Sequence, residues 1–148
     1  MEINLANITL NPQIKNVYGF LIISDWSFLI GTVLKNKKEI NIEKKIKKPF
    51  LPTRASSSAI RFRRIFIERQ YSFIKEIDEH LEQYFIKDNM LNISGLIIAG
   101  QKNTIERYLK YKNRILNKYI ITIIELECDD DKLGFNEAIS KSMISDNL

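Results

Sequence analysis

The chain of 148 residues is poor in the side chains that build disulfides, metal centres and thiol or imidazole catalysis. It contains one cysteine, Cys128, and one histidine, His80. A single cysteine excludes an internal disulfide, and so few soft ligands argue against a zinc site or a catalytic triad. We therefore expect a protein with no metal and no cofactor.

Long apolar runs and a secretory leader are missing as well. No apolar stretch approaches the roughly 20 residues that a membrane-spanning helix needs. The first ten residues, MEINLANITL, carry the acidic Glu2 and no basic segment, unlike a secretory signal. These absences predict a cytoplasmic protein with no membrane partner. The apolar fraction of 45% is ordinary for a globular domain with a real core.

Positive charge is in excess, and it is unevenly placed. The chain has 23 Lys and Arg against 18 Asp and Glu, a net charge of +5. Between Lys35 and Lys75 there are 13 basic and 3 acidic residues, a net of +10, whereas the remainder has a net of −5. Nucleic-acid affinity depends largely on neutralising phosphates. The asymmetry therefore favours a face that binds a polyanion, and the alternative is an ordinary solvated, lysine-rich surface.

Apolar and β-branched runs predict five strands. The first three are separated by short turns, so we expect an antiparallel meander. The last two are apolar on both faces and are separated by a short amphipathic helix, which Asn103 or Thr104 opens, so we expect them to lie parallel. The expected strands begin at Val17, Phe28, Glu39, Leu91 and Tyr119.

A long helix is expected after a loop at residues 49–57, and it runs to about Phe85. Two prolines end the preceding strand, because proline removes a ladder donor. A hydroxyl of Ser56, Ser57 or Ser58 can cap the first turn of the helix. Apolar residues at helical spacing predict one broad stripe along its length. They are Ile60, Phe62, Phe66, Ile67, Phe73, Ile74, Ile77, Leu81, Tyr84 and Phe85.

The chain closes with an acidic turn and a last helix, for which Asp131 is the expected cap. Together the elements predict the α/β class, with a five-stranded mixed sheet, packed helices and one long helix after the functional loop. We find no internal repeat, linker or second domain. The expected organisation is a single domain over residues 1–148, with a lead-in at 1–16 and the loop at 49–57.

The loop and the start of the long helix carry the residue types that bind phosphate. A helix N-terminus offers free amides and partial positive charge, and the planar arginine fork matches phosphate oxygens. The alternative is an ordinary helix whose arginines only face solvent and whose first turn is capped by a serine, and such caps are common. The candidate RNA-binding residues are Lys47, Lys48, Arg54, Ser58, Arg61, Arg63 and Arg64.

Four segments resemble the central domain of the eukaryotic and archaeal class I peptide-chain release factor family. They are YGFLIISDWSFLIGT from Tyr18, SAIRFRRIFIERQ from Ser58, LNISGLIIAG from Leu91 and GFNEAIS from Gly134. The match covers nearly the whole chain from about Tyr18, in order and with few gaps. Any one segment alone would be weak, but together they are specific.

The resemblance implies a domain that swings its loop into the peptidyl-transferase centre of the ribosome. In the family the loop carries Gly-Gly-Gln, whose glutamine positions the water that cleaves peptidyl-tRNA. The implied partners are the ribosome, ribosomal RNA and the tRNA end, and a translational GTPase through domains that these 148 residues do not contain. The chain would then be a piece of a larger factor or a split protein.

The sequence departs from the family at the motif itself. The three motif positions fall at Ala55, Ser56 and Ser57, and none of them matches. A β-carbon where glycine holds positive φ costs about 1 kcal/mol or more, and serine is too short to replace glutamine. We therefore expect a release-factor-like domain in which hydrolysis is impaired or absent, as in pelota-type rescue factors. A divergent active release factor and a generic RNA-binding or rescue module are the alternatives.

Overall fold

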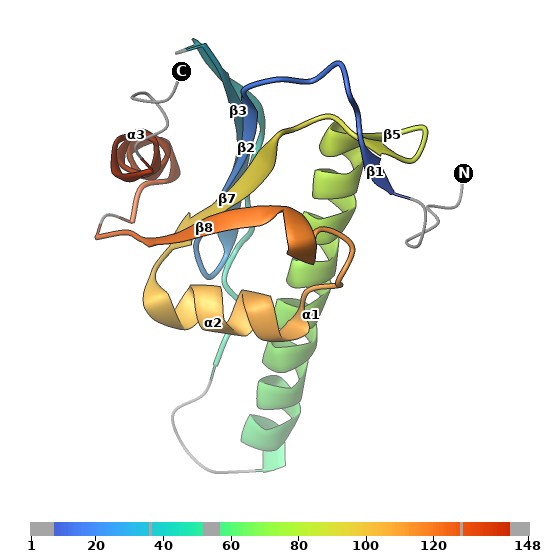
Figure 1. The fold of residues 1–148 in the computed structure, drawn as a ribbon. Helices are drawn as coiled ribbons and strands as arrows, with labels where there is room; N and C mark the ends of the chain where they lie inside the picture. Colours follow the sequence, from blue (N-terminus) through green and yellow to red (C-terminus); the bar gives the residue numbers. More distant parts are fainter. Residues whose placement is uncertain (1–7, 36, 52–56, 128, 143–148) are drawn as a thin grey trace.

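The structure is a computed structural model that describes residues 8–35, 37–51, 57–127 and 129–142. A five-stranded mixed sheet in the order β4-β3-β2-β7-β8 lies at its centre (Figure 1). Its strands are β2 Val17–Ile23, β3 Ser27–Leu34, β4 Lys37–Lys45, β7 Gly95–Gly100 and β8 Ile120–Glu125. Strands β2, β3 and β4 pair antiparallel, whereas β7 lies parallel to both β2 and β8. The predicted fold class, meander and parallel pair are confirmed.

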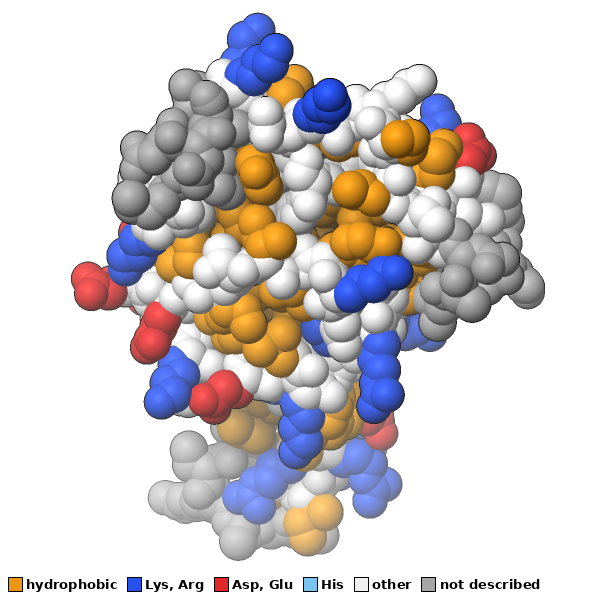
Figure 2. Space-filling view, viewed as in Figure 1, with side chains coloured by type: hydrophobic (Ala, Val, Ile, Leu, Met, Phe, Trp, Pro, Cys, Tyr) orange, Lys and Arg blue, Asp and Glu red, His pale blue; other side chains and the backbone are white. Residues whose placement is uncertain are grey.

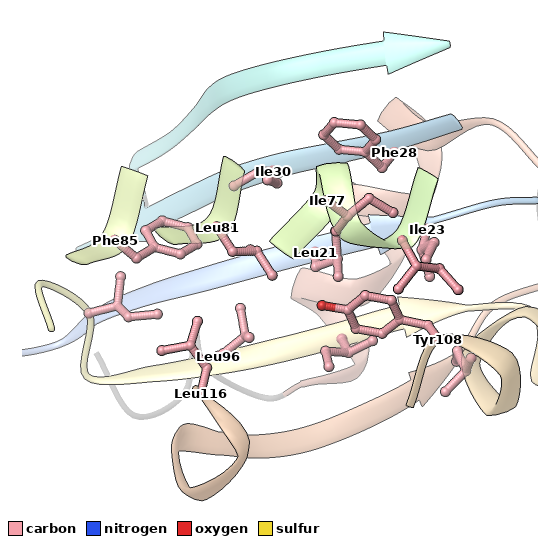
Figure 3. Packing of buried hydrophobic residues seen from close by; sticks show 14 of the residues in the cluster. Leu21, Ile23, Phe28, Ile30, Ile77, Leu81, Phe85, Leu96, Tyr108 and Leu116 are labelled. Carbon is pink, nitrogen blue, oxygen red and sulfur yellow. The ribbon is translucent and has the colours of Figure 1, made fainter. Parts of the chain in front are cut away.

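Helices cover both faces of the sheet (Figure 1). Helix α1, Ser57–Phe85, and helix α2, Lys102–Tyr111, lie on one face, and helix α3, Asp131–Lys141, lies on the other. Because side chains alternate along a strand, each central strand supplies both cores. Figure 3 shows the larger core, where Leu21 and Ile23 from β2 meet Ile77 and Leu81 from α1. In the second core Phe20 packs against Phe135 of α3, with ring centroids 5.4 Å apart.

The expectation that both parallel strands are buried on their two faces holds for β7 alone. All six residues of β7 are buried. Strand β8 lies at the edge of the sheet, and Ile121 and Ile123 are 52% and 47% exposed there. A continuous apolar run indicates a strand, but it does not distinguish a central strand from an edge strand.

A second, three-stranded sheet was not predicted. Strand β1, Thr9–Leu10, lies in the expected lead-in and pairs with β6, Met90–Leu91, which pairs in turn with β5, Ile86–Lys87. The turn between β5 and β6 places Asp88 and Asn89 at φ 53° and 60°. Aspartate and asparagine tolerate this left-handed conformation, which a two-residue hairpin requires. Strands of two residues are too short to show a period in the sequence.

Two helix starts differ from the expected ones. Helix α2 begins at Lys102 rather than at Asn103 or Thr104, and the Thr104 hydroxyl donates to Asp25 instead, at 2.7 Å. Helix α3 is capped by Asp130, whose carboxylate accepts from the Leu133 amide at 2.9 Å. Asp131, the expected cap, accepts instead from the Ser24 hydroxyl at 3.0 Å. The sequence offers two consecutive aspartates as caps, and the contact of Asp131 with Ser24 determines that Asp130 is the one that caps the helix.

Helix α1 begins at Ser57, the last residue of the predicted loop, and ends at Phe85 as expected. Ser56 lies outside the described residues, and Ser58 is exposed within the first turn. None of the helices in the described part of the chain has the length and apolarity that crossing a bilayer requires.

A buried polar contact joins helices α1 and α2. One carboxylate oxygen of Asp78 accepts from the Tyr108 hydroxyl at 2.8 Å, and the other accepts from the Asn113 amide at 2.9 Å. Burial raises the pKa of Asp78 above its ordinary value, although the Asn113 amide and the Tyr108 hydroxyl oppose the rise. Burial also raises the pKa of Tyr108, so its hydroxyl stays protonated and keeps donating.

We expect Asp78→Asn to preserve this contact and to change how stability depends on pH. The amide can accept from the Asn113 amide and donate to the Tyr108 oxygen. In the unmodified chain the folded state holds the Asp78 proton more tightly than the unfolded state does. This group therefore lowers the free energy of unfolding as pH rises from about 4 through the raised pKa. Urea unfolding across pH 3.5–7 should show the free energy of unfolding of Asp78→Asn increasing relative to that of the unmodified chain as pH rises.

The matched variant Asp78→Ala leaves both donors without their acceptor. It should lower the free energy of unfolding by about 2 kcal/mol or more, because each unsatisfied buried donor costs about 1–3 kcal/mol. Equal stability of the alanine and asparagine variants at pH 7 would show that the contact does not hold the helices together.

Candidate nucleic-acid interface

The first half of helix α1 extends past the end of the sheet (Figure 1). Its later apolar residues, from Phe73 to Phe85, belong to the core. In contrast, Ile60, Phe62 and Ile67 are 61%, 40% and 46% exposed. The apolar stripe predicted along the helix is therefore buried in the second half and largely exposed in the first. The periodic pattern continues there, but no sheet lies beneath it.

One aromatic contact supports the projecting half of the helix at its base. Phe66 is half-buried and meets the ring of Trp26 edge-on, with centroids 5.1 Å apart. Trp26 lies in the turn between β2 and β3 and also contacts Phe73 at 6.3 Å. The helix is thus fixed to the sheet up to about Phe66, and the residues before it point beyond the core.

The predicted basic residues gather on this projecting end. Arg61, Arg63 and Arg64 are exposed on helix α1, and Lys47 and Lys48 are exposed after the end of β4. Figure 2 shows Lys and Arg side chains concentrated at this end of the molecule. Of the other predicted site residues, Ser58 is exposed beside them, and Arg54 lies outside the described residues.

These cations have no acidic partner within the described part of the chain. The ion pairs found there lie elsewhere, for example between Arg107 and Asp25 at 2.8 Å and between Lys141 and Glu137 at 2.9 Å. Near the sheet, Lys44 pairs with Glu76 of helix α1. Among the described residues, no carboxylate within ion-pair distance offsets the cluster of cations at the projecting end, and this charge is available to phosphate.

The arginines do not share a single face of the helix. Arg61 and Arg64 are three residues apart and lie on one side, whereas Arg63 is about 100° or more away from each of them. The cations therefore surround the helix end instead of forming one stripe. Such an arrangement suits phosphates that approach the end of the helix from more than one side.

The structure adds two residues that the sequence analysis did not place in the site. Arg69 lines an open hollow of about 520 Å³ together with Lys47, Lys48, Pro49 and Phe50. Phe50 is 67% exposed. The arginine-rich stretch includes Arg69, but only the fold shows that it lies opposite the two lysines. Arg69 lies about three turns after the start of the helix, so nothing in the sequence indicated that it lies near Lys47 and Lys48.

The described residues include neither a cluster of metal ligands nor all three motif positions. They contain no group of three or more His, Cys, Asp or Glu that could hold a metal ion. Of the three motif-equivalent positions, Ala55 and Ser56 lie outside the described residues, and Ser57 is the first residue of helix α1.

The family follows from comparison with known proteins. Residues 17–148 match the family model described as eRF1 domain 2. The chain belongs to this family. The match begins one residue before Tyr18, where the resemblance was first noted, and confirms that resemblance.

Curated relatives carry the same domain within much longer chains. Eukaryotic peptide chain release factor subunit 1 of Loxodes striatus is 28% identical over 135 residues, which cover 89% of this chain and 30% of the factor. The protein of the same name from Cryptosporidium hominis is 28% identical over 128 residues, which cover 84% of this chain and 29% of the factor. The chain thus spans about 30% of the length of the curated relatives it matches.

Solved structures share the fold of eRF1 domain 2. The archaeal translation termination factor aRF1 matches with a TM-score of 0.59 and 17% identity, over 89% of this chain and 37% of that one. Pelota from Archaeoglobus fulgidus matches with a TM-score of 0.53 and 15% identity, over 88% of this chain and 32% of that one. At these identities the likeness concerns the fold.

We expect this eRF1 domain 2 to bind ribosomal RNA in a salt-sensitive way through its projecting end. Each phosphate contact contributes roughly −0.7 to −0.9 to the slope of log affinity against log salt. Changing Arg61 and Arg64 together to Ala should weaken binding and flatten the slope by roughly 1.5. Fluorescence anisotropy with labelled ribosomal RNA fragments at several salt concentrations measures both quantities.

The matched control changes Lys15 and Lys87 to Ala. Lys87 belongs to strand β5, which lies at the other end of the molecule from the start of helix α1 (Figure 1), and Lys15 lies between β1 and β2. Both cations are exposed, and the control removes the same charge. It should leave the slope nearly unchanged. If both double variants lose affinity equally, the arginines act only through net charge and the projecting end is not the binding surface.

Proposed function

We propose that this domain acts in translation termination or ribosome rescue by presenting the projecting end of helix α1 to ribosomal RNA near the tRNA end. The observation that carries the proposal is the uncompensated positive charge on that end of an eRF1 domain 2 fold. Cationic side chains on a rigid helix bind phosphates without any change in the domain. A translational GTPase would engage other parts of a complete factor, because release factor relatives are about three times as long.

We further propose that the domain docks without hydrolysing peptidyl-tRNA. The family's motif glutamine positions the attacking water, and Ser57 occupies its place here. Serine has no side-chain amide and a shorter side chain than glutamine, so it cannot hold a water molecule at the same distance from the helix start. Displacement of a reacting group by about 1 Å can cost a hundredfold in rate. A role in surveillance, rescue or silencing of stalled ribosomes fits binding without cleavage.

The test places this domain in an active release factor, such as the Loxodes striatus protein, in exchange for that factor's own domain 2. The chimera should release formyl-methionine from loaded ribosomes at least about 100-fold more slowly than the intact factor. Restoring Gly-Gly-Gln at Ala55, Ser56 and Ser57 should recover release in the chimera. The 148-residue chain with the same restoration should stay inactive, because its relatives carry this domain within chains about three times as long.

A chimera with Gly-Gly-Ser at these positions separates the loss of the two glycines from the loss of the glutamine. It restores backbone freedom without the glutamine and should stay slow if water positioning is what is missing. Co-sedimentation with ribosomes should be similar for all chimeras. Release by the unrestored chimera at a rate near that of the intact factor would show a divergent but active release factor and would contradict the proposal.

A further inference from the structure

The most exposed large apolar side chain among the described residues lies in the basic hollow. Phe50 is 67% exposed, although apolar side chains of this size are normally buried. Its ring meets Phe62 at a centroid distance of 5.5 Å and an interplanar angle of 88°. The edge-to-face contact holds the ring from one side and leaves most of it open to solvent.

The backbone around Phe50 is restricted, so the ring is presented in a defined place. Pro49 is buried, and its ring fixes its own φ. A proline also limits the residue before it, which here is Lys48. Phe50 is therefore supported by Pro49 on the chain and by Phe62 on helix α1. A supported ring loses little conformational freedom when a flat partner stacks on it.

The charges around the ring are all of one sign. Lys47, Lys48 and Arg69 line the hollow with Phe50, and no acidic residue lines it. Glu76 lies two turns further along helix α1 and is paired with Lys44. The volume of about 520 Å³ is within the range of small-ligand sites, and the hollow is open to solvent, as a site for part of a longer strand must be.

We propose that this hollow binds an unpaired nucleotide of single-stranded RNA, with the base stacked on Phe50 and the neighbouring phosphates on Lys47, Lys48 and Arg69. The inference rests on the proposed function and adds the class of RNA that the site selects. Bases in an A-form duplex are stacked on one another and shielded from an aromatic side chain, whereas bases in loops and single strands are available. An aromatic ring within a basic groove is the combination that single-strand binders use.

The decisive variant is Phe50→Ala, compared with Leu51→Ala as a matched loss of an exposed apolar neighbour. Three probes report binding to the 148-residue chain: a labelled single-stranded RNA of ten nucleotides with mixed sequence, a blunt-ended RNA duplex without a loop, and heparin. Phe50→Ala should weaken single-strand binding about tenfold, because stacking on an aromatic ring contributes that much or more per base. Heparin binding should stay the same, because heparin has charge but no bases. Leu51→Ala should change neither the affinity for the single strand nor the affinity for heparin by more than about twofold.

A second variant reports stacking directly. Phe50→Trp should keep single-strand affinity, and its added fluorescence, measured against the unmodified chain with its one tryptophan, should be quenched by the single strand and not by heparin. If Phe50→Ala binds the single strand as tightly as the unmodified chain, or loses heparin and duplex binding equally, the stacking proposal is wrong while the charged interface stands. If the unmodified chain binds no RNA probe in a salt-sensitive way, both this inference and the proposed function are wrong.

Discussion

The arrangement of the molecule depends on a mismatch of lengths between one helix and the sheet it covers. Helix α1 has 29 residues and is therefore about 43 Å long. The strands beneath it have at most 9 residues, which span about 30 Å. The sheet cannot cover the whole helix, so one end must project. Because the core takes the residues from Phe73 to Phe85, the N-terminal end is the one left outside.

A projecting helix can present charges in a fixed place only if its other end is held firmly. Phe85, the last residue of α1, is buried, and its carbonyl accepts from the Asn92 amide at 2.7 Å. Strand β5 continues from the helix without a gap and joins the small sheet. About two turns before the end of the helix, Asp78 accepts hydrogen bonds from Tyr108 of α2 and from the Asn113 amide that follows α2. These contacts restrain tilt and rotation, so the position of the arginines is set by residues far from them.

Sequence patterns predicted most of the fold, because local signals and long-range packing agree there. β-Branched runs such as the one from Val17 have one stable solution, a strand in a covered sheet. The patterns failed where the answer depends on what lies next to a segment. A helical period shows that a face is apolar, but not whether a sheet reaches it, so the exposure of Ile60 and Ile67 could not be predicted from the pattern. The arginine cluster was found because it is local, whereas the pairing of Arg69 with Phe50 across the hollow requires the tertiary fold.

Under the proposed function, binding and hydrolysis are carried by different residues at the projecting end, and they place different demands on geometry. Phosphate contacts are summed over several cations, act over a Debye length of about 8 Å and tolerate small displacements. Positioning a water for attack tolerates very little, and in this family it depends on three consecutive residues. Replacement of those residues by Ala55, Ser56 and Ser57 removes no positive charge and leaves the cations of helix α1 in place. A domain of this construction can therefore lose hydrolysis while its surface for RNA persists, because the scaffold that aims the helix does not depend on the motif.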